Sequence, residues 1–189
     1  MRKLRLQMQM TINGYVGGLN GENDWMTWNP DNEFIGFMSS LLDESGTLLI
    51  GRKLADGFIN HWAKTAIENP AHPFAGKIAA LPKVVFSKTL DKSTWENTTL
   101  AKGTLADEIA KLKNQDGKDI LVFGGAGFVS SLIKEGLIDE YHLIINPTAM
   151  SNGMTIFNGL DSVKKFTPTQ AKLYPGGKIV LTYQPSQDK

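Results

Sequence analysis

The sequence predicts an α/β fold in which a largely parallel sheet carries an antiparallel hairpin at one edge. Short apolar runs typical of buried strands alternate along the chain with segments of helical periodicity. The last part of the chain contains two strand-like segments, about 165–173 and 178–184, joined by Pro175-Gly176-Gly177. Alternating strands and helices favour parallel pairing, whereas two strands joined by a tight turn pair antiparallel.

The composition indicates one soluble domain. Of the 189 residues 41% are hydrophobic, enough for one core, and we expect residues 1–189 to form one domain with a frayed tail at 185–189. A net charge of +1 without charge blocks does not favour binding to nucleic acid or to an anionic membrane. No apolar run approaches the roughly 20 residues of a membrane span, and the alternating first residues do not form a signal-peptide core. We therefore expect a cytoplasmic protein.

Metal and thiol chemistry find little support in the sequence. Cys is absent, which excludes disulfides, thiolate metal sites and cysteine nucleophiles. The three His are scattered along the chain and argue against a metal site. We interpret His61, His72 and His142 as surface or packing residues.

The first predicted strand spans residues 3–12, where polar and apolar side chains alternate strictly. Its apolar positions are Leu4, Leu6, Met8, Met10 and Ile12. Asn13-Gly14 then favours a turn, and residues 17–30 form a long loop rich in Gly, Asn, Asp and Pro. Long loops in compact domains often carry function.

The most secure helix follows this loop. Apolar residues recur at helical spacing from Phe34 to Leu42, with Asn29-Pro30 as the expected start and Gly46 as the expected stop. Residues 47–50 then form an apolar run that predicts a central strand, and a second helix is expected after it.

The middle of the chain is less regular. Three prolines interrupt residues 62–82, so we expect little regular structure there. Residues 83–86 form another buried strand. Thr104 is the expected cap of a helix that ends at Asp116-Gly117.

Two further strands and a helix complete the pattern. Residues 120–123 predict a buried strand, and the glycine-rich segment 124–127 opens a helix that stops at Gly136. Residues 141–146 form the next strand. Asp139-Glu140 precedes it, and we interpret this pair as structural, holding a turn or a partner cation.

Three of the predicted strands each end in groups that suit a phosphate. A glycine cluster between a strand and a helix lets backbone approach a ligand, and free helix N–H groups attract anions. Basic side chains and a hydroxyl add charge and a donor. The candidate cofactor-binding residues are Gly51, Arg52, Lys53, Ser87, Lys88, Gly124, Gly125, Ala126, Gly127 and Phe128.

Each cluster taken alone has a plain structural interpretation as a tight or solvated turn. Together they follow three successive buried strands, and open α/β sheets bind ligands at strand carboxyl ends. Separated phosphate contacts point to a dinucleotide with an extra phosphate, NADPH ahead of NADH. The spacing of the glycines departs from GxGxxG, which disfavours an ordinary Rossmann domain.

The motifs resemble those of the dihydrofolate reductase-like superfamily, and most closely the branch that contains the reductase domain of bacterial riboflavin biosynthesis. The similarity covers about residues 3–183. The motifs are Thr11-x-Asn13-Gly14, Gly21-x-x-Asp24-Trp25, Gly51-Arg52, Val85-Phe86-Ser87-Lys88, Gly124-Gly125-Ala126, Gly136-Leu137-Ile138-Asp139-Glu140 and Pro147.

The resemblance implies a three-layer fold with a sheet of about eight strands and NADPH bound across the strand ends. It places residues 51–53 and 87–88 along the adenosine and phosphate side of the cofactor, and residues 124–127 beside the pyrophosphate. It also implies a homodimer, an expectation supported by the apolar segment 141–145 near the antiparallel edge.

The expected function is an NADPH-dependent reductase of a small pterin-like or aminopyrimidine heterocycle, because the cofactor carries the hydride chemistry and the protein positions the acceptor. The resemblance points to reduction of 5-amino-6-(5-phosphoribosylamino)uracil. Two alternatives remain: dihydrofolate reductase activity, and a non-catalytic nucleotide-binding dimeric module. The sequence singles out no catalytic side chain.

The candidate acceptor site lies between the first turn, the long loop and the first helix. Relatives carry Ser-x-Asp-Gly where this chain has Thr11-Ile12-Asn13-Gly14, so a neutral amide replaces a carboxylate. The loop tryptophans either stack on a flat acceptor or pin the loop. Asp31 is either a substrate contact or a first-turn acid favoured by the helix dipole. The candidate substrate residues are Asn13, Asp24, Trp25, Asp31 and Glu33.

Overall fold

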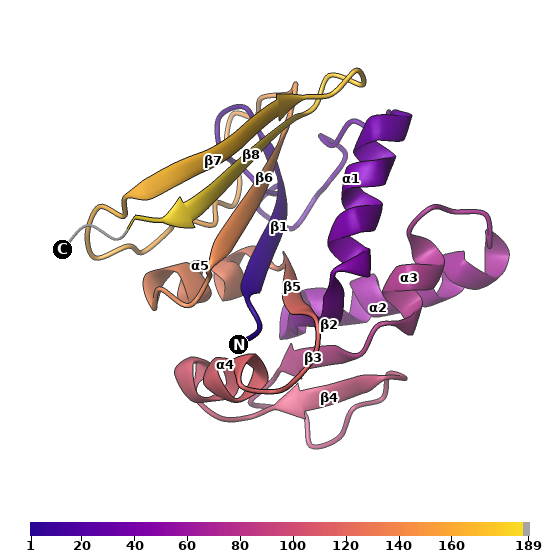
Figure 1. Cartoon of the computed structure of the whole chain (residues 1–189), viewed down its shortest axis with the longest axis vertical. Helices are drawn as coiled ribbons and strands as arrows, with labels where there is room; N and C mark the ends of the chain where they lie inside the picture. Colours follow the sequence, from indigo (N-terminus) through magenta and orange to yellow (C-terminus); the bar gives the residue numbers. More distant parts are fainter. Residues whose placement is uncertain (187–189) are drawn as a thin grey trace.

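The computed structural model describes residues 1–186 and contains one eight-stranded sheet between two layers of helices (Figure 1). The strand order is β4-β3-β2-β5-β1-β6-β8-β7. The strands are β1 (Leu4–Thr11), β2 (Ser45–Gly51), β3 (Lys83–Phe86), β4 (Thr98–Ala101), β5 (Asp119–Gly124), β6 (Glu140–Asn146), β7 (Phe166–Leu173) and β8 (Ile179–Pro185). The helices are α1 (Asn32–Asp43), α2 (Arg52–Glu68), α3 (Ala75–Ala80), α4 (Leu105–Lys113) and α5 (Ala126–Lys134).

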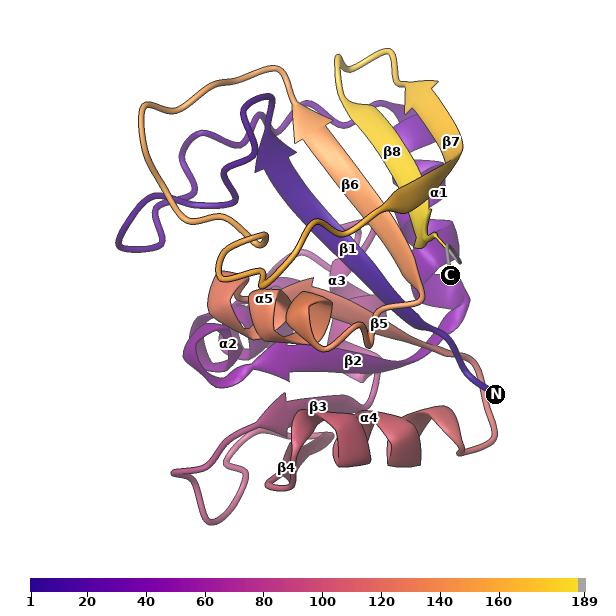
Figure 2. The same ribbon diagram turned by 90° about the vertical axis from the view of Figure 1, so that its left-hand side faces the viewer.

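The helices cover opposite faces of the sheet. Helices α1, α2 and α3 lie on one face, and α4 and α5 lie on the other (Figures 1 and 2). Strand β1 stands in the middle and pairs in parallel with β5 and β6. Its apolar side chains pack under α4 and α5 in one core cluster, and its alternate residues Arg5, Gln7 and Gln9 therefore face the α1 side.

The antiparallel end of the sheet confirms the predicted hairpin, since β8 pairs antiparallel with both β6 and β7. The predicted fraying from residue 185 is wrong for its first two residues. Pro185 is the last residue of β8, and the Ser186 N–H donates to the Lys165 carbonyl at 3.0 Å. Residues 187–189 lie outside the described part of the chain.

The ends of α1 differ from the prediction. Asp31, not Asn29-Pro30, is the N-cap, because its carboxylate accepts from the Phe34 N–H. The helix ends at Asp43, and Gly46 lies inside β2. The Ser45 hydroxyl donates to the Leu41 carbonyl at 2.6 Å, so the last turn of the helix needs no glycine.

Residues 62–82 contain more helix than the sequence analysis predicted. Helix α2 continues to Glu68, and the short helix α3 fits between Pro73 and Pro82. Strand β4 was also missed, because a four-residue edge strand with two threonines carries no strong alternation. Within residues 1–186, no helix has both the length and the apolar character needed to cross a membrane.

Candidate functional site at the strand carboxyl ends

Three neighbouring parallel strands deliver the predicted cofactor residues to one edge of the sheet. Strand β2 pairs in parallel with β3 and with β5. In these registers Gly51 stands opposite Phe86, and Ile50 stands opposite Gly124. The clusters 51–53, 87–88 and 124–128 therefore follow adjacent strand ends, as the sequence analysis expected.

Two helices begin at this edge without a side-chain cap. Gly51 is the N-cap of α2 and Gly125 is the N-cap of α5, and neither helix start has a side-chain hydrogen bond. A Cβ added to Gly51 would lie 3.3 Å from the Gly125 nitrogen, so the two helix starts are close together. Uncapped first-turn N–H groups attract anions, and two such groups side by side suit a pyrophosphate.

The backbone of the glycine loop is open to an approaching ligand. A Cβ added to Gly127 would meet nothing within 4 Å, and one added to Gly125 would meet only Leu54, at 3.7 Å. Gly124 has a φ of 134°, a conformation that favours glycine, and its peptide bond to Gly125 is cis. The loop therefore combines a special backbone shape with free space above it.

Cationic side chains flank the two helix starts. The Arg52 guanidinium lies 5.5 Å from the centre of the Trp95 ring, and Trp95 is held in turn by its Nε1–H bond to Asp56 at 3.2 Å. Lys53 and Lys88 are exposed. Sequence reasoning missed Trp95, because nothing in the irregular segment around it indicates which side chain it would contact.

Ser87 has a structural role as well as its predicted one. Its hydroxyl oxygen accepts from the N–H groups of Thr89 at 3.3 Å and Leu90 at 3.0 Å. The residue is buried, so this oxygen shapes the loop that presents Lys88. The hydroxyl proton remains available as a donor.

Asn13 joins the first turn to the segment after β6. Its Nδ2 donates to the Met150 carbonyl at 2.7 Å, and its Oδ1 accepts from the Met150 N–H at 3.3 Å and from the Thr11 hydroxyl at 2.9 Å. A carboxylate would lack the donor that binds the Met150 carbonyl. The amide at this position therefore matches a local structural demand of this chain.

The two tryptophans of the long loop have different surroundings. Trp25 is buried, and its Nε1–H donates to the Glu22 carbonyl at 3.2 Å. Trp28 stacks on His72, with ring centres 6.1 Å apart, and thereby contacts the segment between α2 and α3. Asp24 is exposed.

The acids of the first helix do not point to a shared acceptor site. Both Asp31 oxygens are used: Oδ1 accepts from the Phe34 N–H and Oδ2 accepts from the Gly176 N–H at 2.7 Å. Burial opposes ionisation, but these N–H groups hold the pKa of Asp31 below its usual value. Glu33 is exposed and pairs with Lys172 at 2.8 Å. Within residues 1–186, the side chains of the five predicted substrate residues form no hydrogen bond or ion pair with one another.

A buried lysine that the sequence analysis missed lies behind the long loop. Lys178 is only 2% exposed, and its Nζ donates to the Thr27 carbonyl at 2.6 Å and to the side-chain oxygen of Asn146. Burial lowers the pKa of Lys178. Asn146 in turn donates from Nδ2 to the Gln9 side-chain oxygen at 2.8 Å. These bonds connect the loop, β6 and β1.

The acidic pair Asp139-Glu140, at the start of β6, is structural, as expected. Asp139 pairs with Lys113 at 2.6 Å, and Glu140 pairs with Arg5 at 3.0 Å. His142 is buried, with its Nε2 2.8 Å from Glu140. This confirms the packing interpretation of His142.

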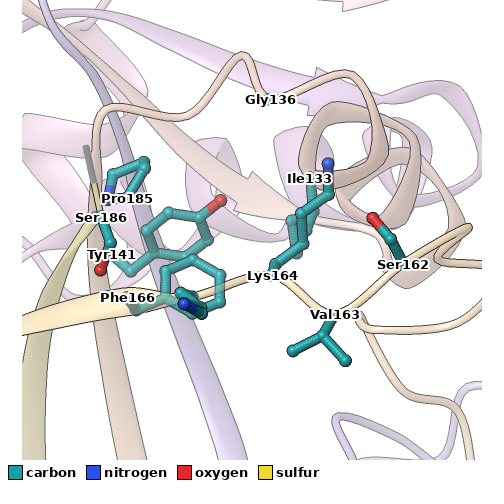
Figure 3. Close-up of a pocket in the computed structure, with 10 residues that line it drawn as sticks. Ile133, Gly136, Tyr141, Ser162, Val163, Lys164, Phe166, Pro185 and Ser186 are labelled. Atoms are coloured by element: carbon teal, nitrogen blue, oxygen red, sulfur yellow. The ribbon is translucent and has the colours of Figure 1, made fainter. Parts of the chain in front are cut away.

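A cavity of about 420 Å³ lies away from this edge (Figure 3). It is bounded by the end of α5 at Ile133, by Lys164, and by the rings of Tyr141 and Phe166, whose centres are 5.0 Å apart. Tyr141 stands at the amino end of β6, opposite to the carboxyl ends that carry the predicted cofactor residues. The cavity therefore does not belong to the candidate site.

The mixed eight-stranded sheet, its terminal antiparallel hairpin and the glycine loop after β5 define a protein of the dihydrofolate reductase-like class. Residues 2–180 match the RibD C-terminal domain family, and the chain belongs to this family.

Similar proteins span the same length. The uncharacterized protein YyaP of Bacillus subtilis (strain 168) is 27% identical over 182 residues, which cover 96% of this chain and 94% of YyaP. The crystal structure of a protein named for riboflavin biosynthesis from Shewanella sp. PV-4 has a TM-score of 0.77 at 24% identity, covering 99% of this chain and 100% of that chain.

A larger protein contains the same fold as one part. The diaminohydroxyphosphoribosylaminopyrimidine deaminase/5-amino-6-(5-phosphoribosylamino)uracil reductase of Thermotoga maritima has a TM-score of 0.66 at 14% identity. The alignment covers 98% of this chain and 57% of that one. These likenesses establish the fold.

Proposed function

We propose that the protein is an NADPH-dependent reductase of a small heterocycle. The observation that carries the proposal is the pair of uncapped helix starts at Gly51 and Gly125, with the Arg52 guanidinium beside them on the Trp95 ring. This combination of free N–H groups, open backbone and exposed cations fits a phosphorylated dinucleotide.

Different residues at this edge would bind different parts of NADPH. The starts of α2 and α5 would hold the pyrophosphate, because their first-turn N–H groups converge there. Arg52, Lys53 and Lys88 would hold the additional phosphate. Bound NADPH would supply the hydride, and the chain would orient the acceptor and exclude water.

Membership of the RibD C-terminal domain family supports a pyrimidine acceptor such as 5-amino-6-(5-phosphoribosylamino)uracil. Dihydrofolate is the second candidate. It fits less well because its pterin calls for a carboxylate, and α1 offers none that is free. Asp31 is the helix cap, while the exposed acids Glu33 and Asp43 pair with Lys172 and Lys77.

The alternative from another class is a nucleotide-binding module without catalysis. Such a module would bind the nucleotide at the same edge of the sheet but would have no working acceptor site. An NADPH titration followed by assays of NADPH oxidation with the phosphoribosylaminouracil and with dihydrofolate separates the three functions. Binding with turnover of the pyrimidine supports the leading proposal, and binding without turnover of either acceptor favours the module.

The variant Gly125→Val tests the location of the cofactor. The added side chain has room beside Leu54 but would occupy the space predicted for the pyrophosphate. We expect NADPH binding to be lost while the thermal midpoint stays close to that of the parent. NADPH binding by a folded Gly125→Val variant would place the cofactor elsewhere.

A further inference from the structure

Gln7 is a nearly buried amide without a hydrogen-bond partner among residues 1–186. The residue is 4% exposed and stands in the middle of β1, on the face toward α1. Its side chain has no hydrogen bond with any residue of the described chain, yet neither amide atom is fully enclosed. Burying an amide without a hydrogen-bond partner costs free energy, and because this amide still reaches solvent, a ligand can supply the missing hydrogen bonds.

Aromatic rings lie beside this amide: Phe37, Phe58 and Phe123 are half-buried, and His142 is buried. The β1–β6 register places Gln7 opposite His142, and on the other side Phe123 directly follows Val122, the partner of Leu6 in the β1–β5 register. The Phe123 ring lies 5.2 Å from that of Phe58 on α2, and the His142 ring lies 5.9 Å from that of Phe37 on α1. Apolar rings around a few convergent polar groups are typical of a site for a flat heterocycle.

Gln9 provides a second amide on the same face of β1. Residues two positions apart on a strand lie about 6.6 Å apart, on the scale of a substituted six-membered ring. The Gln9 oxygen is already occupied by Asn146 Nδ2, and Asn146 is held by Lys178. This arrangement fixes the Gln9 amide and leaves its N–H groups without a described partner.

The two amides lie next to the proposed cofactor edge. Strand β1 is the immediate neighbour of β5, and Phe123 directly precedes Gly124 of the glycine loop. A ring bound over Gln7 would thus lie one strand away from the loop assigned to the pyrophosphate.

The charges around this face select against a cationic ring. The carboxylates on the same side, Glu140 and Glu44, are bound to Arg5, and Glu140 is also bound to His142. No acid on α1 is free, as described above. Two neutral amides match a lactam edge, which pairs a ring carbonyl with a ring N–H, whereas a protonated amidine edge demands a carboxylate.

We infer that Gln7 and Gln9 determine the specificity of the acceptor site by binding the lactam edge of a neutral pyrimidinedione. The inference rests on the proposed function and names the residues that select its pyrimidine acceptor. It also explains why a buried position in the central strand carries an amide where an apolar residue would pack as well.

The test is calorimetric titration of the NADP⁺-loaded protein with two probes, 5,6-diaminouracil and 2,4-diaminopyrimidine. The parent should bind the uracil more tightly. Gln7→Glu should weaken uracil binding at least tenfold and strengthen diaminopyrimidine binding, because the carboxylate pairs with the protonated amidine. Gln170→Glu, at an exposed position of β7, is the matched control and should change neither affinity.

If the buried carboxylate of the Gln7→Glu variant impairs folding, the Gln7→Met variant provides a second test. Met has a similar length and no polar group, so we expect it to retain the parent thermal midpoint and lose uracil binding. A large drop in the midpoint of this variant would show that the amide serves the fold, and would overturn the inference.

The titrations also separate this inference from the proposed function. Failure of the parent to bind NADP⁺ would contradict the proposed function itself. Normal NADP⁺ binding with unchanged probe affinities in both Gln7 variants, or with no uracil binding by the parent, would overturn the inference alone.

Discussion

Gly51 and Phe128 lie in direct contact across the edge of the sheet. A Cβ on Gly51 would come within 2.6 Å of the Phe128 Cβ, an atom close to the backbone that has no freedom to move aside. The glycine that caps α2 is therefore required by the first turn of α5. The two helix starts are joined by packing, in addition to the binding role proposed for them.

Gly51→Ala should destabilise the protein by about 1–3 kcal/mol, because the methyl group overpacks this contact. Gly127→Ala is the matched control within the same edge, since a Cβ there meets nothing within 4 Å. Gly127→Ala should keep the parent stability and lower NADPH affinity, because the methyl group covers open backbone. Urea unfolding and an NADPH titration measure the two effects. Equal stabilities of the two variants would contradict the contact.

NADPH should bind at least tenfold more tightly than NADH. Each charge-assisted bond to the additional phosphate contributes about 1.5–3 kcal/mol, and Lys88→Ala should therefore weaken NADPH binding much more than NADH binding. Lys92→Ala removes an exposed charge from the same loop and serves as the control. An unchanged ratio of the two affinities in Lys88→Ala would assign the phosphate to other residues.

Asn13→Asp should loosen the contact between the first turn and the segment after β6. The variant loses the Nδ2 bond to the Met150 carbonyl and places a negative charge beside that oxygen. The expected loss of stability is about 1 kcal/mol, because the residue is exposed. Acceptor turnover should change more than NADPH affinity. Asn152→Asp, in the connected segment, should leave both unchanged; identical acceptor profiles for parent and Asn13→Asp would refute a role at the site.

Glu140 should make the protein sensitive to acid. The hydrogen bond from His142, against the opposing effect of burial and with help from Arg5 and Lys3, lowers the pKa of Glu140 to about 2. A carboxylate with a lowered pKa stabilises the fold above its unfolded pKa, and this contribution of about 3 kcal/mol disappears as pH falls from about 5 to 2.

Glu140→Gln should therefore be less stable than the parent at neutral pH and should approach it in acid. Urea unfolding at several pH values measures the difference. Glu33→Gln removes an exposed acid with a single partner and should change stability by less than about 1 kcal/mol. A stability difference between parent and Glu140→Gln that is constant with pH would contradict the assignment.

We expect a homodimer formed through the sheet face that β6, β8 and β7 present on the side of α5. Figure 2 shows this face without a helix over it. In the register of the hairpin, Leu173 stands opposite Ile179, and both are exposed, Leu173 to 68%. Light scattering should give twice the 20.8 kDa mass of the chain.

Leu173→Glu should shift this mass toward that of the monomer, because a charge at the interface must be desolvated. Ile67→Glu changes another exposed aliphatic residue, on α2, and should leave the mass unchanged. A light-scattering mass of one chain for the parent protein would contradict the expected homodimer.

The candidate site was predictable in part. The three phosphate-compatible clusters follow apolar strands, and the parallel order of β3, β2 and β5 brings them together as strand alternation implied. The acceptor side was not predictable in the same way. The sequence left Asp31 as either a substrate contact or a first-turn acid, and no local pattern indicates that its second oxygen binds the Gly176 N–H, 145 residues away in the chain.

The sequence by itself determined the fold class, the glycine loop and the basic strand ends, because hydrophobic periodicity and turn chemistry are local properties. Only the tertiary structure decided that Gln7 stands opposite His142 without a side-chain partner among residues 1–186, and that Lys178 is buried behind Thr27. The partners of a polar side chain come from segments distant in sequence, and they are chosen by sheet order and packing, which no local pattern records.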